Sequence, residues 1–99
     1  MKAMKPPPAA ARDLNSVEMA RVWIAERGLH CAINVGIYAD RSDVSEPAAW
    51  GIILADLTRH LSRALSNEAH DPGALIAEIR ASYLRELKDP TSDIEGGFR

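Results

Sequence analysis

The residues whose types and spacing come closest to a catalytic arrangement are Asp56, Arg59 and His60. On a helix, residues four apart lie on the same face, so Asp56 and His60 are neighbours there, with Arg59 beside them. A carboxylate in this position can orient an imidazole and raise its basicity, as in a catalytic triad. No motif marks the nucleophile that a hydrolase would need, although three side chains are available in principle: Thr58, Ser62 and Cys31. The simpler interpretation is a helix-surface pair that contributes roughly a few tenths of a kcal/mol.

The histidines and the cysteine do not form a metal-binding pattern. His30, His60 and His70 lie at no ligand spacing, and the sequence has no pair of cysteines. His30 and Cys31 are consecutive residues of a predicted strand, so their side chains point to opposite faces and cannot easily share one ion. The glycines are scattered and form no phosphate-binding loop. We therefore predict no metal and no cofactor, and we expect Cys31 to be a small core residue.

A second group of residues is typical of a contact surface rather than of catalysis. Trp23 falls on the polar face of a predicted β-hairpin, together with Arg21, His30 and Asn34. Tryptophan beside arginine is common in binding hot spots, and such a pair can stack on another copy, another protein or a flat ligand. The alternative is that Trp23 packs against the tail or a helix of its own chain.

Length, composition and charge exclude several classes of protein. The chain has 99 residues, of which 46% are hydrophobic and 26% are charged, and its formal net charge is -2. This globular composition predicts one small domain, because the chain is too short for a doubly wound sheet or a large barrel. Residues 1–13 carry a net charge of +2, so the remainder carries -4. An acidic folded part argues against binding to nucleic acid.

Cysteine usage and the apolar segments bear on where the protein resides. One cysteine, Cys31, is present, which rules out an internal disulfide and fits a reducing cytoplasm. No apolar run is long enough for a transmembrane helix, and the lysines at the start are not followed by an apolar signal region. We predict a cytoplasmic protein without a membrane partner.

Residues 20–25 and 29–38 predict the two strands of the hairpin. Apolar residues alternate along the second segment: Leu29, Cys31, Ile33, Val35 and Ile37. Gly28 lies between the two segments and would supply the left-handed residue of a bulged hairpin loop. This alternation makes the second segment the clearest strand in the sequence.

The sequence also predicts the pairing of the two strands and leaves one alternative open for the first of them. Placing Ile24 opposite Cys31 and Val22 opposite Ile33 collects the apolar side chains on one face of the hairpin. An alternative for the first strand remains open, because residues 15–18 resemble the capping box at a helix N-terminus. The β-forming residues that follow favour the strand.

Two amphipathic helices follow the hairpin. Ser45 is a favourable N-cap before a proline in the first turn, and the apolar spacing continues to about Asn67. Asp71 and the proline after it repeat this signal, and the second helix ends near Lys88. We expect the aliphatic stripes of both helices to form the core, and the short connection predicts antiparallel neighbours.

The predicted architecture is an α+β fold, with an antiparallel β-hairpin followed by two antiparallel helices in one domain over residues 14–89. Residues 1–13 contain three consecutive prolines and predict a flexible, extended tail. Residues 90–99 predict a loose C-terminal tail. A two-stranded sheet is marginal in water, and two helices cannot cover both of its edges. We therefore expect a homo-oligomer, with a dimer favoured, that completes the sheet.

Several segments resemble a small alphaproteobacterial family of unknown function. They are Arg21-Val22-Trp23-Ile24-Ala25, Gly28-Leu29-His30, Ala48-Ala49-Trp50-Gly51 and the run from Leu54 to His60. The likeness spans most of residues 17–65. It implies a self-contained domain, and it implies no activity and no catalytic residue.

Two classes of function are consistent with the sequence. The favoured one is a non-enzymatic protein-interaction or regulatory module that self-associates and can also bind another protein. The alternative is a small ligand-binding protein or hydrolase that uses Asp56, Arg59 and His60 near an aromatic pocket. Trp50 is a further candidate for binding a partner or ligand, because Gly51 beside it would let another backbone or a ring approach closely. The alternative is that Gly51 is a tolerated surface glycine.

Overall fold

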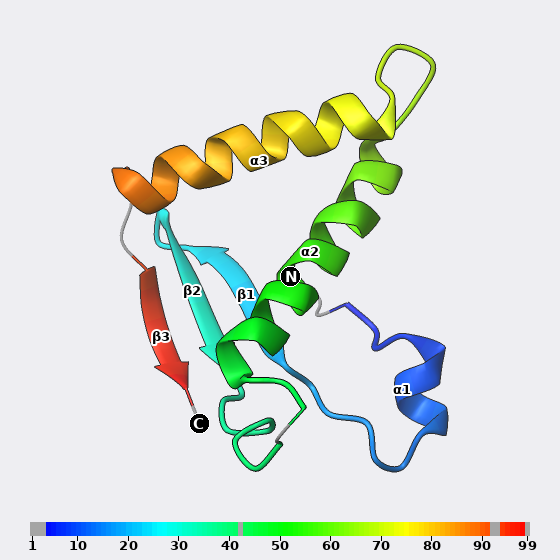
Figure 1. Cartoon of the computed structure of the whole chain (residues 1–99), viewed down its shortest axis with the longest axis vertical. Coiled ribbons are helices and arrows are strands. Elements are labelled where there is room, and N and C mark those ends of the chain that lie inside the picture. Colours follow the sequence, from blue (N-terminus) through cyan, green and yellow to red (C-terminus); the bar gives the residue numbers. More distant parts are fainter. Residues whose placement is uncertain (1–3, 42, 92–93, 99) are drawn as a thin grey trace.

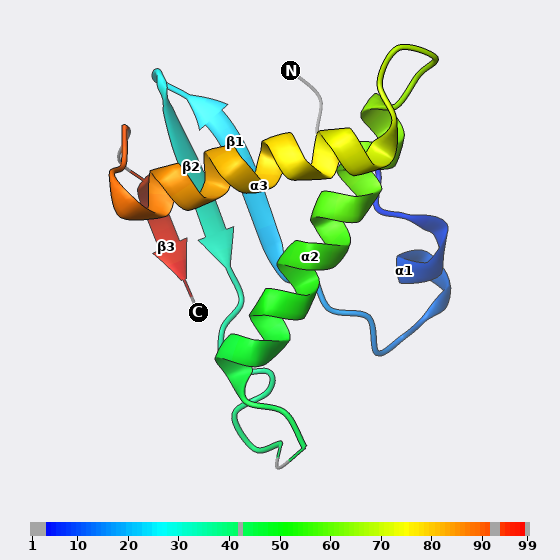
Figure 2. The same cartoon turned by 45° about the horizontal axis from the view of Figure 1, so that its top comes forward.

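A computed structural model describes residues 4–41, 43–91 and 94–98 of the chain. The elements in chain order are α1 (Pro8–Arg12), β1 (Ala20–Ala25), β2 (Gly28–Ile33), α2 (Glu46–Leu65), α3 (Pro72–Lys88) and β3 (Ile94–Phe98). The strands form a sheet in the order β1-β2-β3, in which β1 and β2 are antiparallel and β2 and β3 are parallel. Both long helices connect β2 to β3 and lie on one side of the sheet (Figures 1 and 2). The fold is α+β, as predicted.

The hairpin forms where the sequence predicts it, but its turn is tighter than expected. Residues 20–25 are a strand, so the helical alternative is wrong. Glu26 and Arg27 alone connect the strands, and both have positive φ values, of 50° and 65°. This is the left-handed backbone that two-residue hairpin loops require. Gly28 is therefore the first residue of β2, opposite Ala25, and not the left-handed residue of a bulged loop.

The tight turn shifts the register by two residues from the predicted one. Ile24 lies opposite Leu29, and Val22 lies opposite Cys31. A shift of two residues leaves every side chain on its predicted face, because the side chains of a strand alternate with a period of two. The apolar face is therefore as predicted, although the individual pairs are not.

The second strand is shorter than predicted, since β2 ends at Ile33 and not at Tyr38. After it the chain turns at Gly36, which has a φ of 97°. The carboxylate of Glu46 accepts hydrogen bonds from the backbone N–H of Gly36 (2.7 Å) and of Tyr38 (3.0 Å). The first turn of α2 thus holds the preceding loop in place.

Both predicted helices and their N-caps are confirmed. The Ser45 hydroxyl accepts a hydrogen bond from the backbone N–H of Ala48 at 3.2 Å, and the Asp71 carboxylate accepts one from that of Ala74 at 3.0 Å. Each side chain satisfies an N–H group that has no partner within the helix. The axes of α2 and α3 diverge from the loop that connects them (Figures 1 and 2). The helices therefore do not lie side by side along their length.

The C-terminal segment differs most from the expectation. Within the predicted loose tail, Ile94–Phe98 form β3, which pairs with β2 from Leu29 opposite Ile94 to Ile33 opposite Phe98. Gly96 has a φ of 134°, and a Cβ atom at this residue would lie 1.9 Å from the carbonyl oxygen of Cys31. Only glycine can approach β2 so closely. At the other end of the chain, α1 is a short helix within the predicted extended tail.

The part of the chain whose burial the structure describes has almost no buried core. Among the described residues, the buried ones are Ala49 and Ser62, both on α2. The apolar side chains of the helices were expected to be core, yet Leu57 is 58% exposed and Leu61 is 48% exposed. The cause lies in the arrangement of the layers: across the described elements, no Cα atom of a helix lies within 8 Å of a Cα atom of a strand. The helices stand away from the sheet that they should cover.

The segment that leads into β3 is held by a carboxylate and gives a pH-dependent prediction. Glu86 accepts hydrogen bonds from the backbone N–H (2.8 Å) and the hydroxyl (2.6 Å) of Thr91. These hydrogen bonds lower the pKa of Glu86 below its usual value. A lowered pKa means that the contact is complete above the usual glutamate pKa of about 4.3, and that it is lost as the pH falls through the lower value of the folded state.

We expect the amide resonance of Thr91 to shift on acidification with a midpoint below the usual glutamate pKa of about 4.3. The measurement is an NMR titration from neutral pH downward. In Glu86→Gln the step should disappear, since the side chain no longer titrates. A midpoint at or above the usual value would contradict the contact.

Candidate partner-binding surface

The hairpin places three of the predicted site residues on one face. Trp23 lies opposite His30, and Arg21 lies two residues before Trp23 on the same strand, so all three share the face that is not apolar. Trp23 is 43% exposed, whereas His30 is half-buried. A large aromatic side chain therefore remains accessible beside a guanidinium group.

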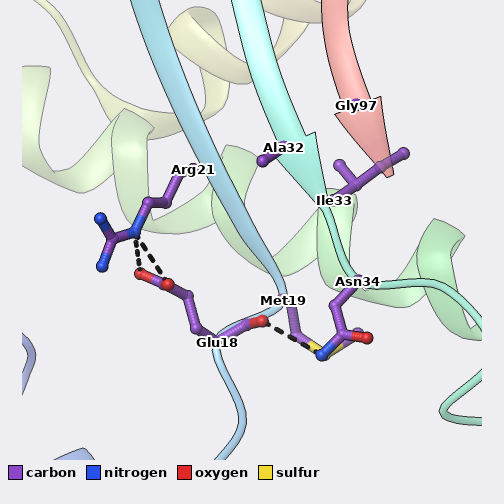
Figure 3. Close-up of a pocket in the computed structure, with 7 residues that line it drawn as sticks. All are labelled: Glu18, Met19, Arg21, Ala32, Ile33, Asn34 and Gly97. Carbon is purple, nitrogen blue, oxygen red and sulfur yellow. Dashed lines mark hydrogen bonds and ion pairs between the residues drawn. The ribbon is translucent and has the colours of Figure 1, made fainter. Parts of the chain in front are cut away.

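Arg21 and Asn34 line a pocket at the open end of the hairpin (Figure 3). Its volume is about 520 Å³, and it is lined by Glu18, Met19, Arg21, Ala32, Ile33, Asn34 and Gly97. The Arg21 Nε donates to both carboxylate oxygens of Glu18 at 2.8 Å. The Asn34 side-chain amide donates to the Glu18 carbonyl at 3.5 Å. Glu18 was not predicted as a site residue, because its spacing from Asn15 also fits a helix cap.

The pair that holds this pocket is an exposed ion pair. The side chains of Arg21 and Glu18 are 59% and 60% exposed, so the pair adds little stability. The Nε–H of Arg21 binds Glu18, and the flat face of the guanidinium is available to stack on an aromatic ring of a ligand or partner.

The residues of the predicted catalytic arrangement lie on α2 and do not converge. Asp56 forms an ion pair with Arg59 and not with His60, its predicted neighbour. All three side chains are exposed, and Trp50 on the same helix is half-buried. None of these four residues lines the pocket at the open end of the hairpin or the pocket between α2 and α3. The structure thus brings Asp56 and Arg59 together and leaves them apart from these two pockets.

A second pocket lies where α2 and α3 diverge. It has a volume of about 580 Å³ and is lined by Leu65, Leu75, Glu78, Ile79, Ser82 and Tyr83. Four of these six side chains are aliphatic or aromatic. This pocket was not predicted, because two helices packed closely along their length would leave no space for it.

A row of four exposed leucines lies along α2. Leu54, Leu57, Leu61 and Leu65 are spaced three and four residues apart and are between 44% and 58% exposed. We refer to this row as the α2 stripe. On the hairpin, Val22 and Ile24 are 61% and 77% exposed. The sequence shows the same residues, but periodicity cannot tell whether the chain itself or a partner covers them.

The loop before α2 carries an ion pair of its own. Arg41 binds Asp43, and this hydrogen bond lowers the pKa of Asp43 and raises that of Arg41. The Arg41 guanidinium also lies 6.0 Å from the centre of the Tyr38 ring. These contacts order the loop and add no reactive group, because both charged groups stay ionised near neutral pH.

Neither a metal site nor a membrane span is found within the described residues. No group of three or more histidine, cysteine, aspartate or glutamate side chains in these ranges is arranged to hold an ion. None of the described helices has the length and apolarity that crossing a bilayer demands.

Comparisons with known proteins identify a family and a related fold. A family model described as a domain of unknown function, DUF5076, matches residues 3–91. A solved structure described as a "putative pyruvate dehydrogenase" from the photosynthetic bacterium Rhodopseudomonas palustrus CGA009 is similar with a TM-score of 0.70. The two sequences are 23% identical, and the match covers 94% of this chain and 90% of that one. This similarity shows a shared fold alone. The comparison with curated proteins found no match.

Proposed function

The chain belongs to the DUF5076 family of domains of unknown function, and from this premise we propose that it is a protein-association module that works as a homodimer. In this proposal the domain carries no catalytic centre of its own. It presents a surface on which a second copy completes the hydrophobic core, and it serves as an interaction or regulatory unit.

The observation that carries this proposal is the exposed area of the single chain. The chain exposes 8858 Å², whereas a compact monomer of this mass exposes about 5,500 Å². Its radius of gyration is 15.6 Å, against about 13 Å for a compact domain of this length. Part of the excess comes from the N-terminal segment. Another part comes from the exposed leucines of α2 and from the exposed valine and isoleucine of β1. The exposure of this apolar area to water is unfavourable.

The excess area is large enough for a permanent interface. The difference between the two areas is about 3,300 Å² per chain. Obligate homodimers bury about 2,000–5,000 Å² in total, or half of that on each subunit. A second copy can therefore cover the α2 stripe and still leave the N-terminal segment in solvent. A small ligand would cover only a fraction of this surface.

For a chain with so small a core, a second copy is a better partner than a different protein to cover the exposed apolar surface. The helices and the sheet of one chain share no close backbone contact among the described elements. Folding then needs the partner at all times, which a copy made from the same gene always supplies. Closed two-fold dimers are also the commonest assembly of soluble proteins. We place this dimer in the cytoplasm, where the free thiol of Cys31 stays reduced.

The stability of the protein should depend on its concentration. If the partner completes the core, the urea midpoint of unfolding rises as the protein concentration is raised, because dissociation and unfolding are coupled. The measurement is a set of urea titrations over a hundredfold range of concentration, followed by tryptophan fluorescence. An identical midpoint at all concentrations would refute the proposal.

A further inference from the structure

The outer edge of β1 is an unprotected sheet edge. In the described sheet, β1 pairs with β2 on one side only, and all six of its residues are exposed. The strand contains no proline and no glycine, and Arg21 is its one charged residue. Proteins usually protect edges with prolines, charges or bulges, and an apolar edge without them is a pairing site. The opposite edge, β3, contains the two glycines Gly96 and Gly97 and is a weaker template.

The hydrogen-bond pattern of the hairpin shows which backbone groups this edge offers. The Asn34 N–H donates to the Met19 carbonyl at 2.9 Å, so these two residues form a hydrogen-bonded pair. Such pairs alternate along an antiparallel ladder. Arg21 and Trp23 therefore direct their N–H and C=O groups toward β2. The residues that alternate with them along β1 direct these groups outward, away from β2. The outward residues are Ala20, Val22 and Ile24.

We propose that this edge binds the same edge of a second copy, antiparallel, around a two-fold axis at Val22. This inference rests on the proposed homodimer and specifies its geometry. Val22 then lies opposite Val22 of the partner subunit, and Ala20 lies opposite the partner's Ile24. Three hydrogen-bonded pairs with two bonds each give about six main-chain hydrogen bonds. The two three-stranded sheets become one continuous sheet.

The side chains on the polar face select this register. It places Arg21 directly opposite the partner's Trp23, and the symmetry repeats the pair. The flat face of the guanidinium can stack on the indole while its edge keeps Glu18. A shift in one direction would place Arg21 opposite the partner's Arg21, and like charges in directly opposed positions are unfavourable. Shifting the partner's strand in the other direction would lose one of the three hydrogen-bonded pairs between the two β1 edges.

The apolar face and α2 favour the same arrangement. Val22 and Ile24 are 61% and 77% exposed, more than any residue of the α2 stripe. Pairing at the β1 edge brings the valines and isoleucines of both copies together. In Figures 1 and 2 the C-terminal half of α2 lies on the β1 side of the sheet, away from β3. A partner at this edge thus also reaches the α2 stripe.

The test combines a backbone variant with a matched side-chain variant. Val22→Pro removes the outward N–H and leaves the pairing with β2 intact, because the N–H of this residue does not face β2. Val22→Ala trims the side chain and keeps the N–H. Sedimentation equilibrium should show a dimer dissociation constant for Val22→Pro that is at least about tenfold higher than for Val22→Ala. Circular dichroism of both variants checks that the hairpin is retained.

Disulfide crosslinking tests the register without relying on proline. In a Cys31→Ser background, Val22→Cys should form a crosslinked dimer in oxidised glutathione, because the two residues face each other across the axis. Ala25→Cys is the control. It is also on β1, but the proposed register separates its two copies by about 20 Å. Preferential crosslinking at residue 22 is the expected result.

Three outcomes are distinguishable. A dimer that is weakened by Val22→Pro and crosslinks at residue 22 supports both the proposed function and this geometry. A dimer with an unchanged dissociation constant in Val22→Pro, or with faster crosslinking at residue 25, overturns the β1 pairing and leaves the homodimer standing. A wild-type chain that is monomeric at high concentration overturns both.

Discussion

Replacing Leu57 and Leu61 by aspartate should convert the dimer into a monomer. Each leucine is about half exposed in the single chain, so the partner would bury the remaining half, which contributes about 1–1.5 kcal/mol per side chain. Two leucines from each of two copies then contribute about 4–6 kcal/mol, or a factor of about 10³–10⁴ in the dissociation constant. Buried carboxylates would add to this loss. Sedimentation equilibrium measures the change directly.

Ile52→Asp is the matched control for this double variant. Ile52 is on the same helix and is 59% exposed, against 58% for Leu57. It lies about 140° around the helix from Leu57, on the face that also carries Asp56 and Arg59. We expect this substitution to leave the dissociation constant within about threefold of the wild type, since a charge on the solvent face disturbs no contact. Equal effects of both changes would mean that the α2 stripe is not the interface.

The second large effect that we expect is the loss of β3 from the sheet when Gly96 is replaced. In Gly96→Ala the new Cβ atom would lie 1.9 Å from the Cys31 carbonyl oxygen, at a φ of 134° that side chains rarely adopt. Neither atom can move without separating the strands, because both belong to the paired backbone. We expect β3 to detach from β2 and the amides of residues 94–98 to lose their protection from hydrogen exchange.

Gly97→Ala provides the comparison, because a Cβ atom at Gly97 meets no other atom within 4 Å and its φ is not in the left-handed region. Exchange of residues 94–98 should be the same in this variant as in the wild type. Mass spectrometry of the exchanged protein resolves this segment. Retained protection in Gly96→Ala would show that β3 is not paired as described.

The parts of the fold that depend on local chemistry could be predicted from the sequence. Ser45 and Asp71 precede prolines and cap the two helices. These signals lie within a few residues of the structures that they start. The alternation around Ile33 identified β2 for the same reason. The hairpin faces were also correct, because an error of two residues in register does not change the face of a side chain.

The parts that depend on distant contacts could not be predicted. β3 pairs with β2 across about sixty residues of chain, and its glycines carry no strand signal of their own. The strand β2 ends early, and in the loop after it Glu46 binds the backbone of Gly36 and Tyr38. Such a contact is invisible in a pattern of hydrophobicity. The turn was misassigned because Glu26 and Arg27 adopt left-handed backbone without glycine.

The candidate site was also predicted only where local sequence determines it. Arg21 and Trp23 follow directly from strand alternation, so their shared face could be identified from sequence. The pairing of Asp56 was misassigned, because Arg59 and His60 are both within helical reach and the guanidinium binds the carboxylate. The exposure of the α2 stripe is a property of the distance between layers, which no local pattern encodes.

The molar mass of the wild-type protein in solution tests the central claim most directly. Sedimentation equilibrium at neutral pH should give twice the chain mass of 10.8 kDa over the whole range of concentrations in which the protein is folded. A folded species with the mass of one chain, even at high concentration, would show that this open arrangement of helices and sheet is complete by itself.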